Sequence, residues 1–137
     1  MDVAINSNPI ALGSWDVVVI GAGAAGLMTC LELPSHLKVL LVNRNTSKRS
    51  ASRWAQGGIA AVTRTEDSLQ SHEQDTLRAG AGLCDADAVQ MLVRKAPQCV
   101  ERLQALGMEF DRDLNGLSTT LEAAHSFRRV LHVQDRT

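Results

Sequence analysis

The sequence of 137 residues contains no tyrosine, and only 3% of its residues are aromatic. Without a series of aromatic side chains, it offers no stacking surface for single-stranded nucleic acid. Its 14 lysine and arginine residues face 15 aspartate and glutamate residues, which gives a net charge of −1. This balance provides no general attraction for nucleic acid or for an anionic membrane. We therefore expect neither a nucleic acid nor a membrane as a partner.

Cysteines and long apolar runs are also scarce. Cys30, Cys84 and Cys99 are widely spaced and form no CxxC pair, so the pattern predicts neither a zinc site nor a disulfide framework, and no metal site is expected. No apolar run reaches the ~18 residues of a membrane-spanning helix. The first residues lack the basic start and apolar core of a secretory signal. Together these absences favour a protein of the reducing cytoplasm.

The strongest positive signal is a dinucleotide fingerprint between two short β-branched runs. Residues 16–20 and 38–42 predict buried parallel strands, and helical spacing runs from Ala24 to about Leu33, where Pro34 ends it. The turn between the first strand and the helix has the form G-x-G-x-x-G. Such a turn holds a pyrophosphate at the N-terminus of the helix. It consists of Gly21, Ala22, Gly23, Ala24, Ala25 and Gly26.

The residues after the second strand leave the identity of the dinucleotide open. An acidic residue is expected there to bind the ribose, but this chain has Asn43 and Arg44. The Asn43 amide is a weaker acceptor than a carboxylate, and Arg44 would suit a 2′-phosphate or lie along an adenosine. Taken alone, this position is compatible with NAD, NADP or FAD.

Further along the chain, the pattern predicts two helices. The first spans 68–79; the second follows Asp85, a good N-cap, and ends near Gly107. We expect Pro97 to kink the second helix or divide it in two. Residues 1–15 have the character of a leader, and residues 111–116 of a turn. Two strands are too few to bury both faces of a parallel sheet, so the sequence predicts the N-terminal part of a larger protein or a truncated product.

Four segments carry a resemblance to a known family: GAGAAG, SRWAQGGIAAV, DTLRAGAGLCD and EAAHSFRRVLHVQDRT. Together they resemble the succinate dehydrogenase/fumarate reductase flavoprotein superfamily and, within it, the L-aspartate oxidase family. The similarity covers about residues 16–137. It implies an α/β fold, the N-terminal part of a Rossmann-like FAD-binding domain. That domain would be incomplete without downstream strands and a capping domain.

The resemblance also implies which residues contact FAD. The segment from Ala51 to Gly58 would lie along the pyrophosphate and the flavin ring, with Ser52 and Gln56 as hydrogen-bonding groups and two glycines against the flat ring. With the fingerprint and the end of the second strand, the expected cofactor-binding residues are Gly21, Ala22, Gly23, Ala24, Ala25, Gly26, Asn43, Arg44, Ala51, Ser52, Arg53, Trp54, Ala55, Gln56, Gly57 and Gly58.

Two positions distinguish this chain within the superfamily. Ala51 stands where the respiratory dehydrogenases carry a histidine bonded to the flavin, so the resemblance implies non-covalent FAD. Glu122 stands where the L-aspartate oxidases carry a glutamate, and a carboxylate suits the α-ammonium group of an amino acid. His125 is expected to assist at the same substrate site. The chain departs from the family at Ala123-Ala124, which replace a glycine pair, and at Phe127.

The resemblance therefore implies FAD-dependent oxidation of L-aspartate to iminoaspartate, with oxygen or fumarate as electron acceptor. In the family this product enters quinolinate and NAD biosynthesis, which makes quinolinate synthase a candidate partner. The alternatives are a fumarate reductase-type flavoprotein, a non-catalytic dinucleotide-binding fragment and an NAD(P)-binding module.

Overall fold

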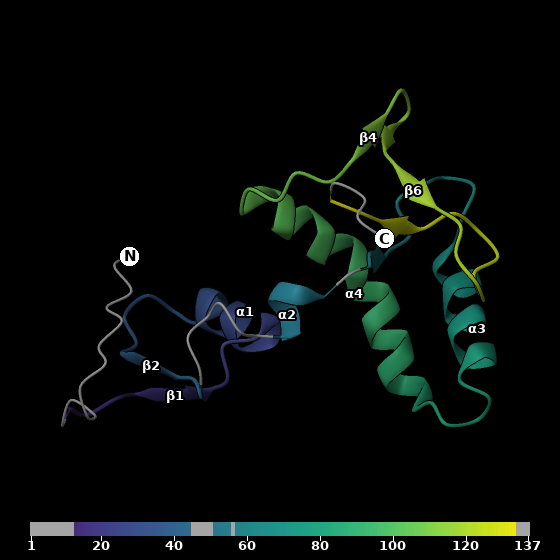
Figure 1. The fold of residues 1–137 in the computed structure, drawn as a ribbon. Helices are drawn as coiled ribbons and strands as arrows, with labels where there is room; N and C mark the ends of the chain where they lie inside the picture. The colour runs from purple at the N-terminus through teal and green to yellow at the C-terminus, as the bar shows by residue number, and fades with distance from the viewer. Residues whose placement is uncertain (1–12, 45–50, 56, 134–137) are drawn as a thin grey trace. The chain divides into compact units, whose positions relative to one another are not determined.

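A computed structural model of the chain describes residues 13–44, 51–55 and 57–133. The chain divides into two compact units, Met1–Ala55 (unit 1) and Gln56–Thr137 (unit 2). Figure 1 shows the helices and strands of both units.

Unit 1 contains the predicted β-α-β arrangement. Strands β1 (Val17–Ile20) and β2 (Val39–Val42) are parallel, with Val17 opposite Val39 and Ile20 opposite Val42. Between them runs α1 (Ala24–Glu32), and a short helix, α2 (Ala51–Trp54), follows β2. Both strands and the helix were predicted within about one residue. The β-branched runs are suited to a pleated surface, and Pro34 lies just beyond the C-cap of α1.

Unit 2 contains a small antiparallel sheet that the sequence analysis did not predict. Strand β7 (Val130–Leu131) is central, with β3 (Ile59–Ala60) on one side and β6 (Thr119–Thr120) on the other. Where a simple turn was expected over 111–116, a hairpin forms from β4 (Arg112–Asp113) and β5 (Gly116–Leu117). Strands of two residues are too short to show an alternating pattern, which is why sequence periodicity did not reveal them.

Two helices accompany this sheet. Helix α3 (Leu69–Ala79) begins after Ser68 and α4 (Ala86–Ala105) after Asp85, each N-cap side chain accepting a hydrogen bond from a backbone N–H three residues ahead. Of the two outcomes expected at Pro97, a kink or a division, the division is wrong: α4 continues through the proline as one helix. Its buried valines lie on both sides of Pro97, so packing supports the helix before and after the proline. They are Val89, Val93 and Val100.

The core of unit 2 lies between α4 and the antiparallel sheet. Val100 of α4, Phe110 and Leu131 of β7 are each at most 5% exposed. Ala61 follows β3, is fully buried and donates its N–H to the Arg129 carbonyl oxygen at 2.9 Å. Within the described part of the chain, no helix is long and apolar enough to cross a membrane.

Candidate functional site

The fingerprint of unit 1 forms a tight turn that brings backbone amides to the start of α1. Gly21 lies in the left-handed region at φ +105° and donates its N–H to the Val42 carbonyl oxygen at 2.8 Å. At Gly26, a Cβ atom would lie 1.9 Å from the carbonyl oxygen of Gly21. Only glycine therefore permits α1 to pack so closely on the turn, as the fingerprint predicts.

Two of the expected cofactor-binding side chains already contact this turn. The Asn43 Oδ1 atom accepts from the Ala22 N–H at 3.4 Å, and the Ser52 Oγ atom accepts from the Ala24 N–H at 3.0 Å. Three segments distant in sequence, the turn, the end of β2 and α2, therefore meet at the start of α1. Three other residues expected to bind the cofactor are exposed: Arg44, Ala51 and Ala55.

The turn fits a diphosphate group. Helix α1 has no capping side chain at Gly23 and no acidic residue in its first turn, so nothing negative opposes an anion there. The helix dipole favours a phosphate at this position, and so do the backbone N–H groups of Ala22 and Ala24 once they exchange their bonds to Asn43 and Ser52 for bonds to the phosphate. The side chains of Arg53 and Trp54, and all of Gln56, lie outside the described residues.

The glycine pair in unit 2 has a structural reason of its own. Gly57 is at φ +128°, and a Cβ atom there would meet nothing within 4 Å. At Gly58 a Cβ atom would lie 2.4 Å from the Leu131 carbonyl oxygen and 2.5 Å from a Val130 methyl group. Gly58 therefore allows the chain to pack against β7. This packing requirement was not predicted from the sequence.

Glu122 and His125 lie in a tight turn that follows β6. The His125 N–H donates to the Glu122 carbonyl oxygen at 3.2 Å, and Ala124 is at φ +67°. This left-handed conformation favours glycine, so replacing the family's glycine pair with alanines leaves strain in the turn. The Glu122 side chain is 49% exposed, and its Oε1 atom lies 3.5 Å from His132 Nε2. His132 is buried and hydrogen-bonded to Thr120 Oγ1 at 2.8 Å, a structural histidine as predicted.

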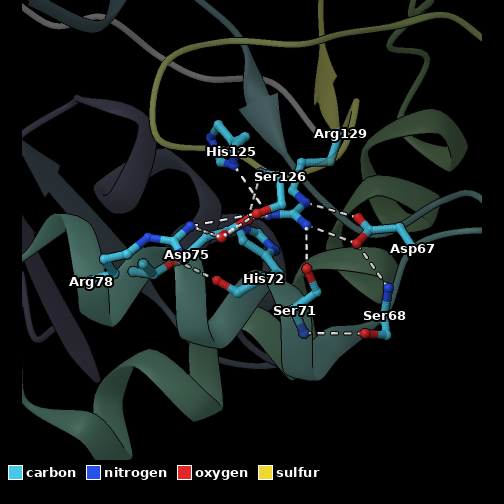
Figure 2. A network of polar contacts seen from close by, with 10 residues as sticks. Asp67, Ser68, Ser71, His72, Asp75, Arg78, His125, Ser126 and Arg129 are labelled. Atoms are coloured by element: carbon cyan, nitrogen blue, oxygen red, sulfur yellow. Dashed lines mark hydrogen bonds and ion pairs between the residues drawn. The ribbon is translucent and has the colours of Figure 1, made fainter.

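The turn continues into a buried polar network centred on Arg129, which is 0% exposed (Figure 2). Its guanidinium forms a two-point ion pair with Asp67, at 2.8 Å from Nε to Oδ2 and 2.7 Å from Nη2 to Oδ1. Nη1 donates to Asp75 Oδ2 at 2.7 Å. The same guanidinium contacts Ser71 Oγ and His125 Nδ1, each at 3.3 Å.

Asp75 ties the turn to α3. It accepts from the Ser126 N–H and from the Ser126 hydroxyl, each at 2.7 Å, and it is also paired with Arg78. Burial alone would raise the pKa of Asp75, but these bonds and the Arg129 guanidinium hold the pKa well below its ordinary value. Burial likewise opposes the charge of Arg129, yet its two carboxylate partners raise the Arg129 pKa. Asp75 and Arg129 are thus both charged in the folded protein.

His72 completes the buried group. Its ring centroid is 5.7 Å from that of His125, and its Nδ1 atom is buried with no hydrogen-bond partner among the described residues. Burial, followed by the charge of Arg129, lowers the pKa of His72, and the nearby carboxylates offset only part of this effect. His72 is therefore neutral at neutral pH.

Apart from His125, the residues of this network were not predicted from the sequence. One signal was present: Ser71 and Asp75 are four residues apart, which places them on one face of α3, and Asp67 directly precedes its N-cap, Ser68. Arg129, their common partner, carries no local pattern, because it lies 54 to 62 residues further along the chain.

A parallel β-α-β unit with an anion-binding turn defines the class of dinucleotide-binding proteins. Residues 16–137 match the FAD binding domain family, and the chain belongs to this family. FAD, which the sequence favoured only through the resemblance, is thereby confirmed as the cofactor.

The similar proteins are flavoproteins of the expected superfamily. The chain is 57% identical to the L-aspartate oxidase of Synechocystis sp. over 123 residues, which cover 90% of this chain and 22% of that protein. It is 55% identical to the L-aspartate oxidase of Nostoc sp. over the same length, 21% of that protein. The chain thus spans about a fifth of the length of these relatives.

Solved structures agree with the fold. Mycobacterium smegmatis Sdh1 in complex with UQ1 aligns with a TM-score of 0.84 and 37% identity, over 91% of this chain and 22% of that one. A quinol-fumarate reductase aligns with a TM-score of 0.81 and 28% identity, over 88% of this chain and 22% of that one. These likenesses confirm the predicted α/β fold and the resemblance to the flavoprotein superfamily.

Proposed function

We propose that the full-length protein oxidises L-aspartate to iminoaspartate, with FAD as hydride acceptor. The observation that carries this proposal is the identity of 55–57% to proteins named L-aspartate oxidase, over 90% of the chain. Oxygen or fumarate would then reoxidise the cofactor. The product would enter quinolinate and NAD biosynthesis, with quinolinate synthase as a candidate partner.

In this proposal unit 1 holds the cofactor. The Gly21–Gly26 turn binds the diphosphate through backbone N–H groups, and Asn43 and Ser52 exchange their present bonds to the turn for bonds to the cofactor. The segment from Ala51 to Gly58 lies along the rest of FAD. When bound, FAD supplies the acceptor for the hydride from the substrate Cα, and the protein orients the substrate. Because Ala51 has no nucleophile, the flavin is held without a covalent bond.

Glu122 recognises the substrate in this proposal. Its carboxylate is half exposed at a turn that the buried network fixes, so it is available to pair with the α-ammonium group of aspartate. His125, in the same turn, contacts a substrate carboxylate. This arrangement would distinguish an amino acid from a dicarboxylate that lacks an amino group.

The Glu122→Gln variant of the full-length enzyme tests this role. We expect aspartate oxidation to fall strongly, because an ammonium left unpaired in a desolvated site costs several kcal/mol, roughly. Fumarate reduction should fall much less, because fumarate has no ammonium group. Steady-state kinetics on both substrates give the comparison, and Glu101→Gln, on the exposed face of α4, is the matched control. An equal loss of both activities would withdraw the recognition role from Glu122.

A second candidate is a fumarate reductase-type flavoprotein without an amine substrate. It is favoured by the fold similarity to Sdh1 and to a quinol-fumarate reductase. Turnover of aspartate against succinate in the full-length protein separates the two candidates. The match to the FAD binding domain family excludes the NAD(P)-binding module as the third alternative. A full-length protein without turnover on either substrate would favour a non-catalytic dinucleotide-binding fragment.

The same proposal extends to the fold of the cofactor domain, to its bounds and to the location of the protein in the cell. The cofactor domain adopts a Rossmann-like arrangement, with residues 1–15 as a leader and residues 16–137 as its N-terminal portion. The protein works in the cytoplasm, where its substrate is available and its thiols stay reduced. Fluorescence of a tagged full-length protein in intact cells tests the location.

A further inference from the structure

Arg129 uses all of its hydrogen-bond donors inside the buried network. A guanidinium has five N–H groups and no acceptor, and it keeps its proton in proteins. Nε and one N–H of Nη2 bind Asp67, and the second N–H of Nη2 faces Ser71 Oγ. Nη1 binds Asp75 with one N–H and faces His125 Nδ1 with the other. Since the side chain is 0% exposed, water does not compete for these positions.

This arrangement has a consequence for His125. A group that can only donate requires an acceptor opposite it, so the Nδ1 atom at 3.3 Å must present its lone pair to Arg129. A neutral imidazole that accepts at Nδ1 carries its proton on Nε2. The Nε2–H group then faces away from the guanidinium, on the other side of the ring.

We propose that Arg129 is a positioning residue that holds His125 as the Nε2–H tautomer, so that His125 donates a hydrogen bond to a carboxylate of the substrate. This role rests on the proposed function for its last step, the contact with substrate. The first step, the tautomer, rests only on the contacts of Arg129. The ion pairs with Asp75 of α3 and with Asp67, just before its N-cap, fix the guanidinium against this helix. The bonds from Ser126 to Asp75 fix the turn on the same helix. Arg129 thus joins the helix to the turn that carries Glu122.

The tautomer is measured directly by NMR of the full-length protein labelled with ¹⁵N in its histidine rings, at neutral pH. We expect His125 to show a protonated Nε2 and an unprotonated Nδ1. His36, which is exposed in unit 1, serves as the reference for an unconstrained ring that exchanges between tautomers. Arg129→Lys keeps the buried positive charge but replaces the planar guanidinium, whose N–H donors point in fixed directions. We therefore expect the tautomer populations of His125 to approach the mixture seen for His36. A protonated Nδ1, or a mixture equal to that of His36 in the unchanged protein, would overturn the proposal.

A pair of variants tests which ring nitrogen serves the substrate without disturbing the ion pairs. His125→Gln places an amide NH2 near the position of Nε2, whereas His125→Asn places it near Nδ1. We expect His125→Gln to retain a kcat/KM for aspartate about tenfold above that of His125→Asn, the factor that a hydrogen bond to a charged group commonly contributes. Flavin content and melting temperature should be equal in the two variants. An asparagine variant as active as the glutamine variant would refute the contact through Nε2.

The two proposals fail in different ways. If the full-length protein turns over succinate and not aspartate, the proposed function is wrong, and the same variant pair measured on succinate still decides the contact. If aspartate is oxidised but His125 carries its proton on Nδ1, the proposed function stands and the role of Arg129 is wrong.

Discussion

At the scale of single residues, two glycines leave no room even for a methyl group. A Cβ atom at Gly26 would lie 1.9 Å from a backbone oxygen, and one at Gly58 would lie 2.4 Å from another. In both cases the obstacle is main chain, which cannot rotate away as a side chain does. Each glycine therefore fixes the approach of two segments, and the first of these approaches shapes the anion-binding turn.

We expect Gly26→Ala to separate α1 from the turn and to abolish flavin binding in the full-length protein. Overpacking of this kind costs about 1–3 kcal/mol or more. Gly23→Ala is the matched comparison, since its Cβ would meet only the Ser52 hydroxyl, at 3.2 Å. It should lower flavin content while leaving the melting temperature of the cofactor-free protein nearly unchanged. Flavin absorbance and thermal unfolding give both quantities; equal melting temperatures for the two variants would contradict the steric argument.

The buried carboxylate of Asp75 predicts a pH dependence of stability. Its pKa is lower in the folded than in the unfolded state, where it is near 3.8, so its contribution is fully present above that value and is lost as the pH falls below it. Asp75→Asn should destabilise the protein by about 3–5 kcal/mol at neutral pH, because Arg129 loses a buried partner. The difference in melting temperature from the unchanged protein should shrink below about pH 4. A constant difference across this range would exclude the charge of Asp75 as its cause.

At the scale of elements, the helices of unit 2 are fixed by their ends and by their buried faces. Asp85 caps α4 through a bond of 3.0 Å from the Ala88 N–H to its side chain, and the capping role was predicted from the sequence. Pro97 does not divide the helix, because α4 packs against the core on both sides of it. Capping is a local property, whereas the course of a helix through a proline depends on the surrounding packing.

We expect Asp85→Ala to destabilise the protein by about 1 kcal/mol, the usual contribution of an N-cap side chain. Asp85→Asn should retain most of the stability, since its amide oxygen still accepts from the Ala88 N–H. Thermal unfolding of the full-length protein measures the difference. An asparagine variant as destabilised as the alanine variant would show that Asp85 acts through its charge rather than as a cap.

At the scale of the whole molecule, the residues proposed to bind the cofactor and the substrate are divided between the two units. The anion-binding turn and α2 belong to unit 1, whereas Gly57, Gly58 and Glu122 belong to unit 2. Position 51, where a covalent bond to the flavin would form, is an alanine and has no side chain that could make this bond. The flavin of the full-length protein should therefore be held by many weak contacts and by no covalent bond.

Acid precipitation of the full-length holoprotein tests this expectation. The yellow cofactor should appear in the supernatant, because unfolding removes every non-covalent contact at once. A parallel precipitation with added free FAD controls for cofactor trapped in the pellet. Colour that stays with the washed protein would mean that another side chain carries the flavin.

The sequence by itself determined the β-α-β unit, its glycine turn and the cap of α4. These features depend on residues close together in the chain, whose spacing reflects local geometry directly. The family and its cofactor were predicted from the resemblance of four segments, because the spacing alone left the dinucleotide open. The tertiary structure decided the antiparallel sheet of unit 2, the packing reason for Gly58 and the network around Arg129. Arg129 lies 62 residues from Asp67 and 54 from Asp75, so no local spacing could pair them. Only folding brings these charges together, and because burial opposes each charge, each group depends on its partners in the network.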